Sequence, residues 1–182
     1  MNETARKNLT IKALDGFEST IGCYLWELDD TRARTWRILE GIAPAVIDWQ
    51  PPLANGNSIG TLLYHIAAIE MDWLYNEVME TKLPDKVWEN FPYPVRDSKD
   101  HLTVVAGLSL DDHFKRLDST RQLLLSTFNS MTLDDFRRLR HLERYDVSPE
   151  WVIHHLMQHE AEHRGEMAVV RALAERESLN AT

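Results

Sequence analysis

Residues 148–177 read SPEWVIHHLMQHEAEHRGEMAVVRALAERE, and this segment has the clearest helix start in the chain. Ser148 is a typical N-cap, Pro149 suits the first helical position, and Glu150 lies where the helix dipole favours a negative charge. We therefore predict a helix from Ser148 to about Glu177. Its core-facing stripe is expected to contain Val152, Leu156, His159, His163, Met167, Val170 and Ala174, with Leu173 at its edge.

Three further segments have helical spacing, and the alternation typical of strands is nearly absent. We expect helices over residues 17–42, from Ser58 as N-cap to about residue 80, and from Ser109 onward, where Asp112 completes a capping box. Residues 132–139 predict one more short helix. The fold class predicted from these segments is all-α, with four long amphipathic helices in a four-helix bundle.

Residues 81–108 interrupt the helical pattern with three prolines, Pro84, Pro92 and Pro94. A connection of this length is unusual between neighbouring antiparallel helices. It is long enough to cross the bundle, so the second and third helices are expected to run parallel, in up-down-down-up order. This connection contains three aromatic residues, Trp88, Phe91 and Tyr93. We expect them either to line a surface for a partner or, as is more common, to anchor the connection to the core.

Composition predicts a single domain over residues 1–182, with residues 1–16 as a loose N-terminal extension. The chain has 27% charged and 43% hydrophobic residues and no apolar run approaching the roughly 20 residues of a membrane span. The net charge of -9 disfavours nucleic acid and anionic lipid as partners. A polar N-terminus and a single cysteine, Cys23, predict a cytoplasmic protein.

Four of the eight histidines lie within residues 154–163, in a segment that includes His159-Glu160-Ala161-Glu162-His163. Imidazoles four residues apart on a helix project from one face and can bind one metal ion together. His65 is the candidate third ligand, because it lies on the predicted buried side of the second helix. Three histidines leave coordination positions free, which is typical of catalytic sites. Zinc, nickel, iron and copper all suit imidazole ligands.

The remaining histidines receive other predictions. His101, His113 and His141 are assigned to loops or charged surroundings. His155 is expected at the edge of the buried stripe, either beside the metal ligands or at the surface, and His154 is expected to be solvated. A lone buried histidine is more often a hydrogen-bonded core residue than a ligand, but two in one stripe favour a common metal ion.

Glu160 has two interpretations, a general base at the metal or a surface residue, since it is rotated about 100° from His159 around the helix. A zinc peptidase is a remote alternative, because no third histidine follows and Glu175 and Glu177 lie more than about 15 Å away along the helix. A di-iron carboxylate site is excluded, because no histidine other than His163 has a glutamate three residues before it.

Residues 57–65 (NSIGTLLYH), followed by Trp73, and residues 155–165 (HLMQHEAEHRG) resemble the two signature helices of the DinB/YfiT-like superfamily. The resemblance implies an up-down-down-up four-helix bundle and a divalent metal, commonly zinc or nickel, held at positions matching His65, His159 and His163. It also implies frequent dimers. Where many members have glutamine after the Arg-Gly pair, this chain has Glu166.

Two function hypotheses follow. The first is a metal-dependent enzyme acting on a small molecule, either an S-transferase that uses a low-molecular-weight thiol, as some members of that family do, or a hydrolase that uses water. The second is a metal-stabilised stress-response module for binding or dimerisation, without catalysis. Both hypotheses depend on a metal ion bound by the three predicted ligands.

Overall fold

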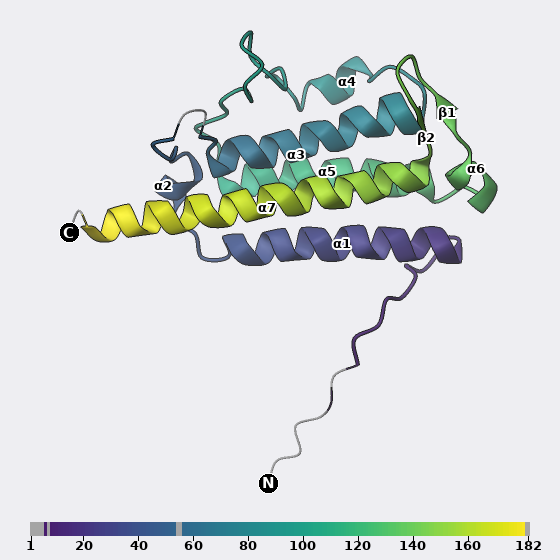
Figure 1. Cartoon of the computed structure of the whole chain (residues 1–182), viewed down its shortest axis with the longest axis horizontal. Coiled ribbons are helices and arrows are strands. Elements are labelled where there is room, and N and C mark those ends of the chain that lie inside the picture. Colours follow the sequence, from purple (N-terminus) through teal and green to yellow (C-terminus); the bar gives the residue numbers. More distant parts are fainter. Residues whose placement is uncertain (1–5, 7, 54–55, 181–182) are drawn as a thin grey trace.

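The computed structural model describes residue 6, residues 8–53 and residues 56–180. Four long helices, α1 (Ser19–Leu39), α3 (Ile59–Trp73), α5 (Leu110–Phe128) and α7 (Pro149–Asn180), lie side by side (Figure 1). Three short helices, α2 (Pro44–Ile47), α4 (Asp85–Trp88) and α6 (Leu133–Arg137), lie in the connections. The structure therefore confirms the prediction of a mostly helical, all-α protein.

The helix starts follow the capping signals in the sequence. The Ser58 hydroxyl accepts a hydrogen bond from the Thr61 amide at 3.2 Å, and the Ser148 hydroxyl accepts one from the Trp151 amide at 3.2 Å. Ser109 and Asp112 form the complete capping box. These side chains satisfy amide groups that have no partner within the helix, which stabilises each start at the predicted residue.

The first helix is shorter than the prediction of residues 17–42. Its N-cap is Glu18, whose carboxylate accepts hydrogen bonds from the amides of Thr20 and Ile21 at 2.8 and 3.1 Å. The helix ends at Leu39, because Glu40 has extended backbone angles and Gly41 has a φ of 70°. Glycine adopts this left-handed conformation without the steric cost that a side chain would add.

The second long helix continues beyond Trp73 as a π-helical turn, η1 (Leu74–Val78). The Met79 amide donates to the Leu74 carbonyl at 3.0 Å, a bond five residues apart instead of four. The helical segment therefore reaches close to the predicted residue 80. Such π turns are frequent at functional sites, because the extra residue shifts the side chains that follow.

The long connection after η1 is fastened to α3 by its aromatic residues. The Tyr64 hydroxyl donates to the Tyr93 carbonyl at 2.6 Å and accepts from the Tyr93 amide at 3.0 Å. Phe91 is buried and lies edge-to-face against Tyr64, whereas Trp88 is exposed. The anchoring interpretation therefore holds for Phe91 and Tyr93.

Two short strands, β1 (Arg140–His141) and β2 (Asp146–Val147), pair antiparallel between α6 and α7, with Arg140 opposite Val147. They form the only sheet within the described ranges 8–53 and 56–180. The near absence of strand-like alternation in the sequence agrees with this small sheet. The hairpin leads the chain directly into the start of α7.

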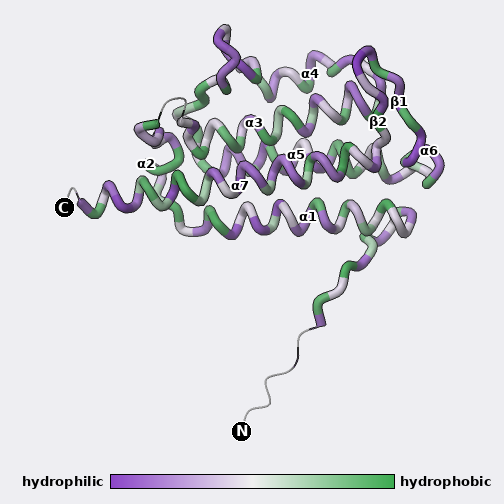
Figure 2. Tube along the Cα trace, in the orientation of Figure 1, coloured by the Kyte–Doolittle hydropathy of each residue, from purple (hydrophilic) through white to green (hydrophobic). Residues whose placement is uncertain are grey.

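The core lies between the long helices. Figure 2 shows hydrophobic and hydrophilic residues alternating along each of them, as expected for helices with one buried face. The buried stripe of α7 contains Val152, Leu156, Met167, Val170 and Ala174, all from the predicted set. His159 and His163 lie within this stripe but are half-buried, so they border both the core and solvent.

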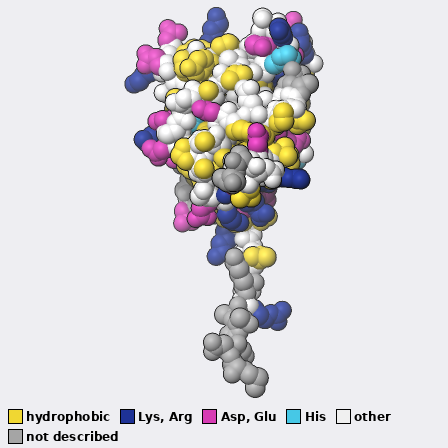
Figure 3. Space-filling view, turned by 90° about the vertical axis from the view of Figure 1, so that its left-hand side faces the viewer, with side chains coloured by type: hydrophobic (Ala, Val, Ile, Leu, Met, Phe, Trp, Pro, Cys, Tyr) yellow, Lys and Arg dark blue, Asp and Glu magenta, His cyan; other side chains and the backbone are white. Residues whose placement is uncertain are grey.

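The surface carries charges of both signs. Figure 3 views the end of the molecule where α2 and the C-terminus of α7 lie, and acidic and basic side chains are interspersed there with hydrophobic ones. Of the helices in the described part of the chain, none has the combination of length and apolar character that a membrane crossing requires.

The predicted N-terminal extension falls partly outside the described residues, which omit residues 1–5 and 7. Residue 6 and residues 8–14 belong to no helix or strand. The end of this segment contacts the first helix, because the Leu14 amide donates to the Gly22 carbonyl at 3.2 Å.

Candidate metal centre

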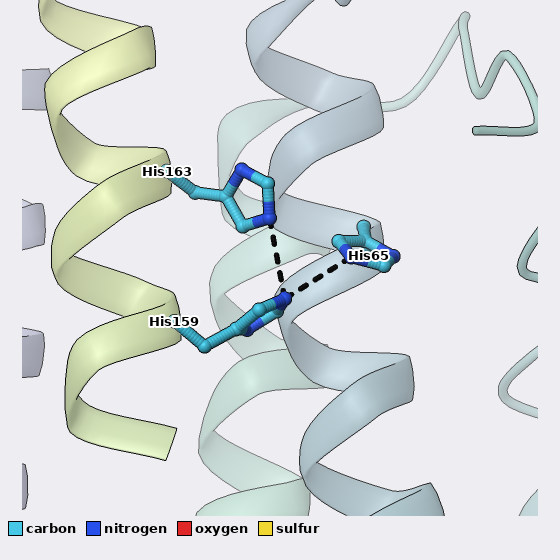
Figure 4. Close-up of side chains that lie close together, drawn as sticks. All are labelled: His65, His159 and His163. Atoms are coloured by element: carbon cyan, nitrogen blue, oxygen red, sulfur yellow. Dashed lines mark hydrogen bonds between the residues drawn. The ribbon is translucent and has the colours of Figure 1, made fainter. Parts of the chain in front are cut away.

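The three predicted ligands come together between α3 and α7. Figure 4 shows the His65 ring projecting from α3 toward the rings of His159 and His163 on α7. The Nε2 atom of His159 lies 3.1 Å from Nε2 of His65 and 3.2 Å from Nε2 of His163. One ring nitrogen from each histidine lies within 4.8 Å of the other two. The structure therefore brings together the side chains that the sequence selected.

This spacing fits a shared cation. Two nitrogens bound to one zinc ion at about 2.0–2.1 Å in tetrahedral geometry lie about 3.3 Å apart. The observed separations of 3.1 and 3.2 Å are close to that value. Within the described residues, no fourth histidine, cysteine or carboxylate joins the group. The arrangement can thus hold a divalent metal through three nitrogens and leave further coordination positions free.

Burial keeps two of the three ligand rings, those of His65 and His159, in the neutral form. It lowers the pKa of His159 to about 3, with His163 and His65 acting in the same direction. It also lowers the pKa of His65 to about 4, again with help from His163. Both rings are therefore neutral at neutral pH, the form that binds metal. Nδ1 of His65 has no hydrogen-bond partner among the described residues, so the polar contacts of this ring go through Nε2.

Glu166 orients His163, a role that sequence reasoning left open. Its Oε2 lies 3.2 Å from Nδ1 of His163, and its Oε1 accepts a hydrogen bond from the Asn57 side chain at 3.0 Å. An ionised carboxylate only accepts, so Nδ1 carries the proton and Nε2 presents its lone pair to the other histidines. The hydrogen bond from His163 is the main cause of a lowered pKa at Glu166. Carboxylate–histidine pairs of this kind are the usual support of metal ligands.

Glu160 lies in a different environment from its neighbour His159. It is only 1% exposed, so it is not a surface residue. Both of its carboxylate oxygens accept hydrogen bonds from Nε of Arg32 on α1, at 2.9 and 3.1 Å. Two adjacent residues of α7 therefore face different helices: His159 faces α3, and Glu160 faces α1.

A buried cluster of four charged residues surrounds this contact. We call it the ionic cluster: Arg32 on α1, Glu70 on α3, Arg121 on α5 and Glu160 on α7. Arg32 bonds Glu70 at 2.8 Å, and Arg121 bonds Glu70 at 3.0 Å. Arg121 also lies 3.7 Å from Glu160. Burial alone would raise the pKa of Glu70, but Arg121 and Arg32 outweigh it and hold that pKa below its ordinary value.

Sequence reasoning missed the ionic cluster, although a signal was present. Each member occupies an apolar-stripe position: Arg32 is four residues after Leu28, Glu70 four after Ile66, Arg121 four after Leu117, and Glu160 four after Leu156. A charged residue in a buried stripe needs a partner of opposite sign, because an unpaired buried charge is very costly. Two arginines and two glutamates at such positions would have predicted mutual pairing.

The other histidines divide into three groups. His101 and His141 are exposed and lie near Asp97 and Asp146, as the sequence predicted, and His154 is exposed as well. His155 is half-buried, with its ring centre 5.9 Å from that of His159. This location agrees with the predicted place beside the ligands.

The prediction for His113 was wrong. It lies inside α5 with 1% of its surface exposed, and neither ring nitrogen has a hydrogen-bond partner among the described residues. Its Nε2 lies so close to Gly60 that a Cβ there would be 3.1 Å away. Neighbouring charges in the sequence suggested solvent, but packing of α5 against α3 buries the ring.

Comparisons with known proteins identify a family and a similar fold. A family model described as the DinB superfamily matches residues 27–167. The fold is similar to the crystal structure of a conserved protein from Enterococcus faecalis, with a TM-score of 0.64 and 15% sequence identity, covering 82% of this chain and 94% of that chain. Identity this low shows a common fold alone. No curated protein matches the chain.

Proposed function

The chain belongs to the DinB superfamily, and from this premise we propose that it is a metal-dependent enzyme whose ion is held by His65, His159 and His163. The observation that carries the proposal is the convergence of three Nε2 atoms at separations of 3.1 and 3.2 Å. Three neutral nitrogen ligands with positions left free are typical of catalytic rather than structural zinc sites. Zinc and nickel are the metals that the family resemblance favours.

A divalent ion at such a site supplies Lewis acidity, which makes water or a thiol a stronger nucleophile at neutral pH. The protein's own residues provide the rest. Burial holds His65 and His159 in the neutral form, and Glu166 holds the proton of His163 on Nδ1. The His163 side chain is 19% exposed, which gives a small molecule access to the site. A small-thiol S-transferase and a hydrolase both suit this arrangement.

We propose that Glu160 positions His159 instead of acting as the base. The support is that both carboxylate oxygens already accept hydrogen bonds from Arg32. An anchored Glu160 limits rotation of α7 about its axis, and the adjacent His159 then keeps its direction toward His65. A base would need a free oxygen within reach of the reacting group.

We also propose that the four long helices form an up-down-down-up bundle. In Figure 1, α2 and α6 mark opposite ends of the molecule; α3 begins near α2, and α5 ends near α6. The helices α3 and α5 therefore run in the same direction, and α1 and α7 run in the opposite direction. Further support comes from the ionic cluster, which includes one residue from each long helix.

Elemental analysis of protein purified without a histidine tag or added metal tests the proposed function. Stoichiometric zinc or nickel is expected in the wild type and in a His101→Ala control, which changes an exposed histidine. His65→Ala is expected to lose the metal, because two ligands on one helix bind an ion weakly. Metal retained by His65→Ala would contradict the proposed site.

Cobalt substitution separates the two chemical versions. If a small thiol binds at the free position, adding it is expected to produce a thiolate-to-cobalt absorption band. The S-transferase version is wrong if no thiol changes the spectrum, and the hydrolase version then stands. A structural metal is indicated if His159→Ala unfolds the protein and neither thiols nor electrophiles raise the melting temperature of the metal-bound form.

Glu166→Ala is expected to weaken metal binding by about 10–100-fold, because His163 loses the acceptor that orients its ring. Competition with a chromophoric chelator measures this affinity. Glu162→Ala is the matched control, since Glu162 is an exposed glutamate one turn earlier on α7. Equal affinities in the two variants would show that Glu166 does not support the site.

The other parts of the sequence-based prediction stay predictions. These are a cytoplasmic location, a homodimer, and a small-molecule substrate without nucleic-acid or membrane partners.

A further inference from the structure

A second feature near the metal centre is an aromatic pocket of about 450 Å³. It lies where the end of α3, the β2 strand and the start of α7 meet, and its aromatic lining consists of Trp73, Tyr145 and Trp151. Leu139 and Val147 add further apolar surface. A volume of this size is in the range of small-molecule sites.

The pocket concentrates hydrophobic side chains that are open to solvent. Trp151 is 47% exposed, Tyr145 is 45% exposed and Leu139 is 48% exposed. Single exposed hydrophobic residues are ordinary, but a contiguous group with a concave shape marks a binding site. This group is therefore a candidate binding site.

The rings are held in place before any ligand arrives. The Tyr145 hydroxyl donates to Oε1 of the buried Glu77 at 2.9 Å, which connects the hairpin to the π turn η1. The planes of Trp73 and Tyr145 differ by 22°, and those of Trp73 and Trp151 by 31°. Nearly parallel aromatic faces suit a flat ring, which gains by offset stacking on them.

Charge narrows the ligand class. Asp146 is the one charged residue among those that line the pocket, and its carboxylate already lies 2.9 Å from Nδ1 of His141. No lysine or arginine belongs to the lining of this pocket as the described residues define it. An anionic ligand would find no counter-charge, and a cationic one would find the single carboxylate already paired with His141, so a neutral ligand is favoured.

His155 joins the pocket to the metal centre. Its ring is stacked on Trp151, with a centroid distance of 5.2 Å and an interplanar angle of 5°, and lies 4.2 Å from Trp73. On its other side, the ring centre of His159 is 5.9 Å away. Trp151, His155, His159 and His163 follow one another at intervals of four residues, so one face of α7 leads from the pocket to the ligands.

We propose that the aromatic pocket binds the flat aromatic part of a neutral organic substrate, whose reactive end extends past His155 to the metal centre. The connection to a reaction rests on the function proposed above. Binding of the ring does not, because every residue that forms the pocket lies outside the metal ligand set.

Calorimetric titration of the full-length, metal-loaded protein with 2-naphthol tests the pocket. Trp151→Ala is expected to weaken binding by about tenfold, because it removes one of the stacking faces. Trp88→Ala is the matched control: Trp88 is 48% exposed against 47% for Trp151, and it lies outside the pocket. It is expected to change the affinity by less than about twofold.

Two comparisons sharpen this test. Trp151→Phe keeps an aromatic face and is expected to recover most of the binding, which excludes misfolding as the cause of loss in Trp151→Ala. Decahydro-2-naphthol has the same skeleton without the π system and is expected to bind about fivefold more weakly than 2-naphthol. Equal binding of both compounds, or equal binding to Trp151→Ala and Trp88→Ala, would overturn the proposal.

Metal content and oligomeric state, measured on the same samples, distinguish the remaining outcomes. If naphthol binding depends on Trp151 but the protein holds no metal, the pocket stands and the proposed function fails. If the metal is present but no binding depends on Trp151, the pocket proposal fails alone. If Trp151→Ala converts a dimer into a monomer and 2-naphthol does not bind, the pocket is an interface between copies, which also overturns the proposal.

Naphthyl-alkyl thiols test the connection to the metal. The helical rise from Trp151 to His159 is about 12 Å, so affinity is expected to peak at an alkyl chain of that span. The higher affinity of these thiols relative to 2-naphthol is expected to disappear in the metal-free His65→Ala variant. A thiol series without such a peak would show that the pocket does not serve the metal centre.

Discussion

Glu160→Ala is expected to lower the free energy of unfolding by about 3–5 kcal/mol, because it leaves the two buried arginines of the ionic cluster, Arg32 and Arg121, to share Glu70 as the one buried carboxylate. Arg32 and Glu160 have side chains only 6% and 2% exposed, so water cannot replace the lost interaction. Urea unfolding followed by circular dichroism measures the effect. A chelator should be present in all samples, because Glu160 adjoins His159 and a change in metal binding would add to the result.

Asp30→Ala is the control for this prediction. Asp30 pairs with Arg34 at 2.7 Å on the surface of α1, where both side chains are partly or largely exposed. Loss of this ion pair is expected to lower the free energy of unfolding by less than about 1 kcal/mol. Replacing both Arg32 and Glu160 by methionine is expected to restore much of the stability, because no unpaired charge then remains from that contact. A small effect of Glu160→Ala would mean that the ionic cluster is solvated or rearranges.

His113 is expected to make the protein less stable as the pH falls from about 6.5 to about 4. Burial lowers its pKa from 6.5 to about 4, and Arg116 acts in the same direction, while Asp48 and Asp112 act against them. Between these pH values the unfolded chain binds a proton at His113 and the folded protein does not. The free energy of unfolding therefore decreases by about 3 kcal/mol over this range and is unaffected by His113 above it.

A His113→Leu variant isolates this contribution. Its unfolding free energy, measured with a chelator from pH 7 to pH 4, should fall by about 3 kcal/mol less than that of the wild type. His101→Leu replaces an exposed histidine and should follow the wild-type curve. Parallel curves for the wild type and His113→Leu would show that the ring is protonated in the folded state or reaches solvent.

The metal centre was predictable because its ligands obey local rules. His159 and His163 are one turn apart on one helix, and the position of His65 in the stripe of α3 follows from the same periodicity. The structure needed only to bring the two helices into contact for the three Nε2 atoms to meet. The caps of α3, α5 and α7 were predictable for the same reason, since each depends on residues within one turn.

Other features depend on partners distant in the sequence. Glu166 contacts His163 within one turn of α7, but the residue that holds its second oxygen, Asn57, lies 109 residues earlier in the chain. The sequence predicted Glu160 either at the metal, because of the peptidase-like H-E-x-x-H motif, or at the surface, because of its rotation from His159 around the helix. Its actual partner, Arg32, lies 128 residues earlier.

The amino-acid sequence by itself determined the helical class, the helix starts and the three histidines, because hydrophobic periodicity, capping and ligand spacing act over a few neighbouring residues. Only the tertiary structure decided which buried charges pair, that His113 is enclosed, and that Trp73, Tyr145 and Trp151 form one pocket. These outcomes depend on the packing of side chains from separate helices, and no local pattern specifies which rotations of those helices bring them into contact.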